Sequence, residues 1–100
     1  MEKQLPIECG DGWRSLIEAC DRELRELDPH YEPVQIKEKF GGLRYYFHPS
    51  ESKTSIWREM LLVTTKYEAL SMEICEACGQ PGSTMKGRGW IVTRCEEHAK

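Results

Sequence analysis

Four side chains near the end of the sequence have the types and the spacing of a metal site. Cys75 and Cys78 are separated by two residues, Cys95 and His98 are also separated by two, and sixteen residues lie between the pairs. Thiolates and imidazoles in two such pairs are typical ligands of tetrahedral zinc, each pair occupying one edge of the tetrahedron. We therefore predict that Cys75, Cys78, Cys95 and His98 bind one zinc ion.

The predicted zinc site is structural. A catalytic zinc ion keeps an open position for water or substrate, whereas four protein ligands complete the tetrahedron here. Gly79 directly after the second cysteine favours a tight knuckle whose backbone amides point at the thiolates. The glycine-rich segment between the pairs ends in the strand-like WIVT and predicts a hairpin. Zinc bound in this way contributes directly to the free energy of folding.

A second stretch whose residue types could bind a ligand is KEKFGGLRYYFH, Lys37 to His48. A two-residue turn at Gly41-Gly42 predicts a β-hairpin. One face then covers the core through the pairs Phe40–Leu43, Glu38–Tyr45 and Ile36–Phe47. The opposite face carries Lys39–Arg44, Lys37–Tyr46 and Gln35–His48. The candidate ligand-binding residues on it are Lys37, Lys39, Arg44, Tyr46 and His48, which offer cations for phosphate and an aromatic ring for stacking. The alternative is that this face is simply solvated.

Two helices are predicted around the hairpin. Apolar residues at helical spacing indicate a helix over 11–27, with Asp11 as a candidate N-cap and Cys20 in the buried stripe. A second stripe indicates a long helix from about Ser52 to the first cysteine pair; its members are Ile56, Met60, Val63, Tyr67, Leu70 and Ile74, widened by Trp57 and Leu61. The predicted fold class is therefore α+β: helix, β-hairpin, long helix and a C-terminal zinc knuckle with its hairpin.

Length and composition suit one small globular domain over residues 1–100. Hydrophobic residues make up 39% of the chain and charged residues 31%. The start of the sequence has no apolar signal-peptide core, so a reducing, cytoplasmic location is expected, where the five cysteines serve as metal ligands or packed thiols. Cys9 is expected to be an idle or buried thiol.

Charge is unevenly distributed along the chain. Residues 1–33 carry nine acidic and four basic side chains, whereas residues 34–58 carry two acidic and five basic ones, within a total net charge of −3. Lys86, Arg88 and Arg94 form a further basic group in the zinc segment. Such asymmetry indicates two surfaces of opposite sign.

The blocks GDGW (10–13), KEKFGGLRYY (37–46) and CEACGQPG…GW…TRCEEH together resemble a family of small uncharacterised zinc-binding proteins encoded by phages and prophages. The resemblance implies a mobile-element origin and action inside a host cell, and it supplies no activity. The zinc segment alone is similar to treble-clef and zinc-ribbon modules.

Two functional hypotheses remain. In the first, the basic and aromatic hairpin face binds a phosphate-bearing ligand, either a nucleotide or nucleic acid, with Lys86, Arg88 and Arg94 extending the surface. In the second, the protein is an inhibitor or adaptor of a host protein, such as a defence enzyme, which it contacts through the acidic face of its first helix. That face comprises Glu18, Asp21, Glu23 and Glu26. No nucleophile–base pattern, phosphate loop or paired carboxylates indicate an enzyme.

Overall fold

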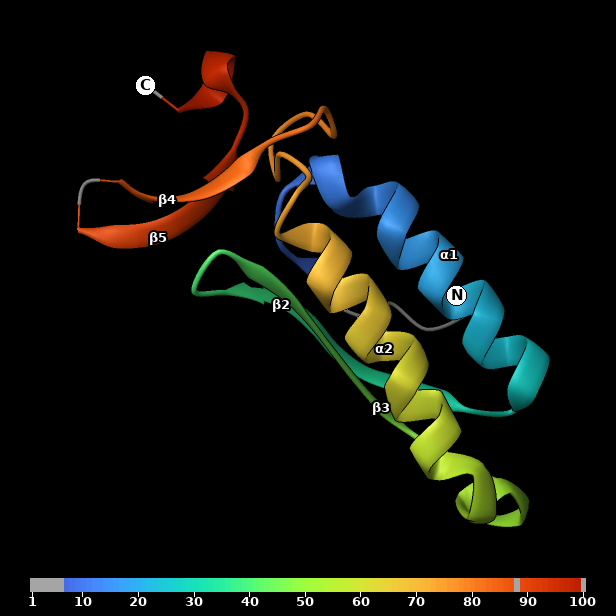
Figure 1. Cartoon of the computed structure of the whole chain (residues 1–100). Coiled ribbons are helices and arrows are strands. Elements are labelled where there is room, and N and C mark those ends of the chain that lie inside the picture. The colour runs from blue at the N-terminus through green and yellow to red at the C-terminus, as the bar shows by residue number, and fades with distance from the viewer. Residues whose placement is uncertain (1–6, 88, 100) are drawn as a thin grey trace.

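The computed structural model describes residues 7–87 and 89–99 and has an α+β fold, as the sequence predicts. The elements in chain order are β1 (Ile7–Glu8), a 3-10 helix (Asp11–Trp13), α1 (Arg14–Leu27), β2 (Glu32–Lys39), β3 (Gly42–His48), a 3-10 helix (Glu51–Ile56), α2 (Trp57–Ser71), β4 (Ser83–Gly87), β5 (Trp90–Arg94) and a 3-10 helix (Glu96–His98). In Figure 1, α1 and α2 lie side by side, the β2–β3 hairpin runs along α2, and the β4–β5 hairpin projects past the β2–β3 turn. Within the described residues, no helix is both long and apolar enough to cross a membrane.

The first helix buries the stripe that its periodicity predicts. Its buried residues are Leu16, Ile17, Cys20 and Leu24, and Trp13 of the preceding 3-10 helix is buried with them. Burial raises the pKa of the Cys20 thiol to about 12, so this cysteine is a packed, protonated side chain. The prediction that Asp11 caps the helix is wrong, because its side chain makes no capping hydrogen bond and instead pairs with Arg14 Nη2 at 3.6 Å.

A buried carboxylate fixes the connection that follows α1. Asp28, which is fully buried, accepts hydrogen bonds from the backbone N–H groups of His30 (3.2 Å) and Ser50 (2.7 Å) and from the Ser50 hydroxyl (2.8 Å). Burial alone would raise the pKa of Asp28, but these donors outweigh it and lower the pKa. Asp28 thereby ties the end of α1 to the loop that follows β3.

The hairpin forms, but its turn lies one residue earlier than predicted. Phe40 and Gly41 are the two turn residues, with φ of +54° and +83°, as a type I′ turn requires. The Gly41 N–H donates to the Glu38 carboxylate (2.8 Å), which explains why a charged residue stands on the inward face. Phe40 is therefore not a core residue, since its side chain is 63% exposed.

The change of turn shifts the predicted pairing by two residues. Lys37 now lies opposite Arg44, Gln35 opposite Tyr46 and Lys39 opposite Gly42, and an irregularity between Pro33 and Gln35 brings Glu32 opposite His48. Because side chains alternate with a period of two, a shift of two leaves every predicted side chain except that of Phe40 on its predicted face. Ile36, Leu43, Tyr45 and Phe47 accordingly pack into the core.

The second helix covers the open edge of the sheet. The sheet has the order β1–β2–β3, with the short β1 parallel to β2, so β3 is an edge strand. The N–H of Leu43 donates to Ser71 Oγ (2.9 Å) and that of Tyr45 donates to a carboxylate oxygen of Glu68 (3.0 Å). An edge strand covered in this way is not available to another chain.

The position of α2 along this edge explains where its predicted stripe fails. The helix ends at Ser71 rather than reaching Cys75, and its buried face includes the polar residues Thr64 and Ser71. Met60 and Tyr67 are buried as predicted, whereas Leu70 and Trp57 are exposed. The buried face must supply acceptors to β3, so hydrophobic periodicity alone does not describe it.

Candidate functional site

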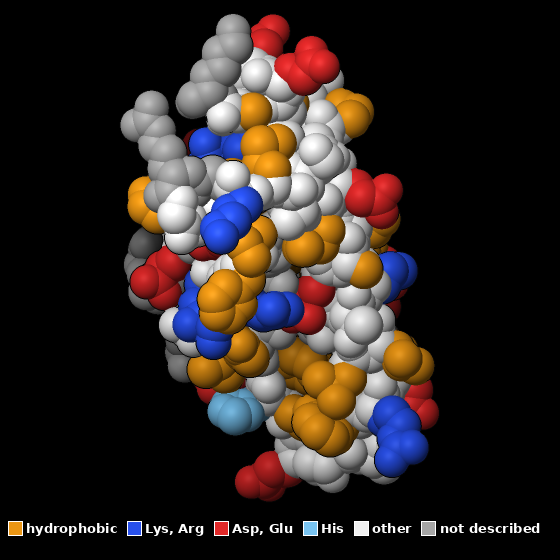
Figure 2. Space-filling model, turned by 60° about the vertical axis from the view of Figure 1, so that its left-hand side comes forward, with side chains coloured by type: hydrophobic (Ala, Val, Ile, Leu, Met, Phe, Trp, Pro, Cys, Tyr) orange, Lys and Arg blue, Asp and Glu red, His pale blue; other side chains and the backbone are white. Residues whose placement is uncertain are grey.

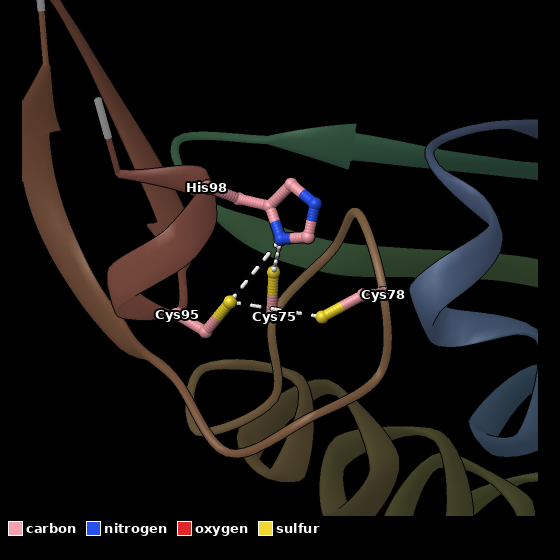
Figure 3. A group of neighbouring side chains, drawn as sticks. All are labelled: Cys75, Cys78, Cys95 and His98. Carbon is pink, nitrogen blue, oxygen red and sulfur yellow. Dashed lines mark hydrogen bonds between the residues drawn. The ribbon is translucent and has the colours of Figure 1, made fainter.

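The four predicted metal ligands come together in space. Cys75 and Cys78 lie in the loop after α2. Cys95 directly precedes the C-terminal 3-10 helix and His98 is the last residue of that helix, and the four side chains converge in Figure 3. Their ligand atoms all lie within 4.8 Å of one another, so the cluster could hold a metal ion. The Cys78 Sγ–Cys95 Sγ and Cys75 Sγ–His98 Nδ1 distances are both 3.7 Å. A tetrahedron with zinc–sulfur bonds of about 2.3 Å has sulfur–sulfur edges of about 3.8 Å, so the Cys78–Cys95 distance is compatible with zinc. The Cys95 Sγ–His98 Nδ1 distance, 3.2 Å, is shorter.

The loop around Cys75 is the tight knuckle that the sequence predicts. Gly79 has a φ of +85°, and its N–H donates to the carbonyl of Cys75 (2.9 Å). Burial of Cys75 opposes ionisation, but hydrogen bonds from the backbone of Cys95, Cys78 and Ala77 outweigh it and lower the pKa of this thiol to about 6. The backbone thus favours the thiolate form that binds metals.

The knuckle is fastened to the beginning of the first helix. The Gly12 N–H donates to the Glu76 carbonyl (2.7 Å), the Gly10 N–H donates to the Glu76 carboxylate (2.8 Å), and the Trp13 indole donates to the Ile74 carbonyl (2.9 Å). Side chains at residues 10 and 12 would collide with Glu76, so glycine permits this approach. The GDGW block therefore connects the candidate metal centre to the core.

The hairpin between the two ligand pairs also contacts the main sheet. Thr93 is fully buried and its hydroxyl donates to the Gly41 carbonyl at 2.5 Å. Thr84, opposite Thr93 in the β4–β5 ladder, is hydrogen bonded to it through its hydroxyl (2.9 Å). This face of the β4–β5 hairpin therefore supports the Phe40–Gly41 turn, a contact that the sequence does not predict.

The five predicted ligand-binding residues lie on the outward side of β2 and β3. Lys37 and Arg44 are directly opposed and half-buried, whereas Lys39, Tyr46 and His48 are exposed. Figure 2 shows the side of the molecule that carries β4 and β5 in Figure 1, where Lys and Arg side chains lie among hydrophobic ones. Lys37, Lys39 and Arg44 form no ion pair with any residue in 7–87 or 89–99.

Other charged groups modify this surface. Glu8 lies beside Lys37 in the β1–β2 pairing and accepts a hydrogen bond from Gln35 (3.3 Å), so one carboxylate borders the cations. In the β4–β5 hairpin, Lys86 is exposed, while the Arg94 guanidinium donates to the His98 carbonyl (3.4 Å). Arg88 lies outside the residues that the structure describes. Phe40, which the sequence pattern places in the core, is exposed next to Lys39, whose Nζ lies 5.5 Å from the ring centroid.

The acidic face of α1 is partly engaged in internal contacts. Asp21 accepts hydrogen bonds from Tyr31 and Arg25, and Glu23 accepts them from Lys66 and Tyr67. Glu18 and Glu26 are exposed. A cavity of about 350 Å³ lies beside α1; its lining residues are Ile7, Cys9, Gly10, Asp11, Arg14, Ile17, Glu18 and Asp21. Burial, with nearby Glu76, raises the pKa of Cys9 to about 11, so the thiol there is unreactive at neutral pH.

Comparisons with known protein families, with curated proteins and with solved structures find no match for this chain. The resemblance to phage-encoded proteins therefore stays a prediction.

Proposed function

We propose that the cluster of Cys75, Cys78, Cys95 and His98 holds one structural zinc ion. The donor set of three thiolates and one imidazole suits zinc, and the Cys78–Cys95 sulfur–sulfur distance of 3.7 Å is close to the edge of a zinc tetrahedron. A zinc ion bound there would cross-link two segments of the chain, because its four ligands come from the loop after α2 and from the segment after β5. The ion would thereby hold the knuckle around Cys75 against the C-terminal segment.

Elemental analysis of the purified protein tests this proposal. We expect one zinc ion per chain, and we expect Cys78→Ser to lose zinc and to melt at a lower temperature. Cys9→Ser is the matched control, because Cys9 lies outside the cluster and its loss should leave the zinc content unchanged. Zinc-free wild-type protein with an unchanged melting temperature would contradict the proposal.

We further propose that the protein is a binding module for a phosphate-bearing ligand. The observation that carries this proposal is the pair Lys37–Arg44, two cations directly opposed across the strands and without an ion pair in the described residues. Like charges in opposed positions destabilise a β-ladder, and a bound anion would offset that cost. Lys39, two residues from Lys37 on the same face, adds a third positive charge.

The hypothesis of a protein partner for the acidic helix has less support. Asp21 and Glu23 are satisfied by neighbouring donors of the same chain, so only part of the acidic face is available. The cavity beside α1 adjoins this face, but Arg14 pairs with Asp11 within it. Within the described part of the chain, the cations of the hairpin face have no comparable ion pairs, and this difference favours the phosphate-bearing ligand.

The test is a binding titration with phosphate, pyrophosphate, nucleoside triphosphates and short oligonucleotides. The Lys37→Ala/Arg44→Ala variant should lose binding of whichever of these compounds the wild-type protein binds most tightly. Its free energy of unfolding should not fall, because the substitutions remove a repulsive pair. Arg22→Ala/Arg58→Ala is the matched control, with the same change of charge at two positions on α1 and α2. The affinity should fall with salt at a slope of roughly −1.4 to −2 on logarithmic axes, as two or three phosphate contacts on a single strand predict. Equal binding by both double variants would contradict the proposal.

A further inference from the structure

Phe40 occupies a backbone conformation that its residue type rarely adopts. Its φ of +54° lies in the left-handed region, and the first central position of a type I′ turn favours asparagine, aspartate or glycine. Burial does not compensate, because the ring is 63% exposed. Backbone strain retained at an exposed position points to a function for the side chain that occupies it.

The Phe40 ring continues the cationic face of the hairpin. Lys39 Nζ lies 5.5 Å from the ring centroid, and Arg44 and Tyr46 project from the outward face of β3, two residues apart. Tyr46 is 45% exposed. Gly42 and Tyr46 are separated by about 13 Å along the strand. Two exposed aromatic rings therefore stand at the ends of a strip, and the three cations of the hairpin face lie between them.

The β4–β5 hairpin extends this strip beyond the turn. Ile91 belongs to the face of β4–β5 that meets Gly41, as the short approach of its side chain to that residue shows. Lys86 lies directly opposite Ile91 in the ladder and shares this face. A fourth cation thus lies on the face of β4–β5 that meets the Phe40–Gly41 turn.

We propose that this strip binds single-stranded nucleic acid, with Phe40 and Tyr46 each stacking on a base and the cations contacting the phosphates between them. This proposal rests on the proposed function and restricts the class of phosphate-bearing ligand to single-stranded nucleic acid. Two stacking positions separated by cations require at least two connected nucleotides, so a mononucleotide would fill only part of the strip. A duplex keeps its base faces stacked inside, where the rings cannot reach them. The net charge of −3 also disfavours the many phosphate contacts of a duplex binder.

Fluorescence anisotropy with labelled hexamers of deoxythymidine and of uridine tests the proposal on the zinc-loaded protein. We expect Phe40→Asn and Tyr46→Ala each to weaken hexamer binding at least about fivefold, the low end of the effect of losing one stacked base. Trp57→Ala is the matched control, because Trp57 is a similarly exposed aromatic residue at the start of α2. Phe40→Asn should also keep or raise the melting temperature, since asparagine suits the turn; a purely structural role for Phe40 predicts the reverse.

The outcomes separate this proposal from the proposed function. If mononucleotides bind as tightly as hexamers, or if a duplex binds more tightly, the single-strand proposal is wrong. It is also wrong if Phe40→Asn and Tyr46→Ala bind like Trp57→Ala. In each of these cases, loss of binding in Lys37→Ala/Arg44→Ala would leave the proposed function intact. If no phosphate-bearing compound binds the wild-type protein, both proposals fail.

Discussion

Replacement of Gly12 by alanine should detach the knuckle around Cys75 from the start of the first helix. A β-carbon at this position would overlap the Cys75 carbonyl oxygen and lie 2.5 Å from the Glu76 carbonyl oxygen. These are backbone atoms, so no side-chain rotation relieves the clash. Gly12 does not have a positive φ, and alanine itself fits the local backbone conformation. The expected effect is therefore purely steric.

The magnitude follows from the hydrogen bonds that must break when the knuckle moves away. Three bonds join the two parts, with Gly12, Gly10 and Trp13 as donors. At about 1 kcal/mol each, their loss lowers the free energy of unfolding by about 3 kcal/mol. For a chain of this size, each kcal/mol corresponds to about 4–8 °C, so the melting temperature should fall by about 12–24 °C.

Thermal unfolding followed by circular dichroism on zinc-loaded protein measures this change. Gly89→Ala is the matched control, because Gly89 has a φ of +97° but a β-carbon there would meet no heavy atom within 4 Å. That substitution should cost only the left-handed backbone penalty, roughly 1–2 kcal/mol. The reasoning is refuted if Gly12→Ala melts within about 5 °C of the wild type, or if Gly89→Ala proves the more damaging of the two.

The remaining predictions concern two carboxylates. Asp28→Ala should destabilise the protein by about 2–3 kcal/mol in urea unfolding, because buried donors of His30 and Ser50 lose their acceptor; Ser50→Ala, which removes the hydroxyl bond alone, should cost about 1 kcal/mol. The pKa values of Asp28 and of Glu23 are both lowered in the folded protein, Glu23 by hydrogen bonds from Lys66 and Tyr67. Their stabilisation is complete above the unfolded pKa values near 4 and is lost as the pH falls below them. Asp28→Asn and Glu23→Gln should each flatten the decline in urea midpoint between about pH 5 and pH 2, and unchanged curves would contradict the assignment.

The sequence predicts those parts of the structure that are determined by residues close to one another along the chain. The spacing of Cys75 and Cys78 predicts that they are metal ligands, and apolar residues that recur with the helical period predict α1. The hairpin faces are predicted correctly although the turn is not, since a two-residue shift preserves alternation. The place of Phe40 in the turn is not predictable, because its conformation is one that its residue type disfavours.

The parts that the sequence does not predict depend on contacts between distant segments. Ser71 and Glu68 look like ordinary polar residues of a helix, and only the position of α2 beside β3 makes them acceptors for strand N–H groups. Gly10 and Gly12 likewise gain their role from Glu76, more than sixty residues away. Neither relation leaves a periodic or compositional pattern in the sequence.

The attachment of the knuckle to the start of α1 bears on the order in which the chain folds. The contact between residues 10 and 76 spans 66 positions, so it encloses both helices and the main β2–β3 hairpin. A ribosome-bound chain that has emerged only as far as α2 can pair β2 with β3, but its Trp13 indole still lacks its acceptor. Because the entropy cost of closing a loop rises only slowly with its length, this late contact can form readily once the cysteines have emerged. We expect the first helix to reach its final protection from hydrogen exchange only after the last quarter of this sequence has been synthesised.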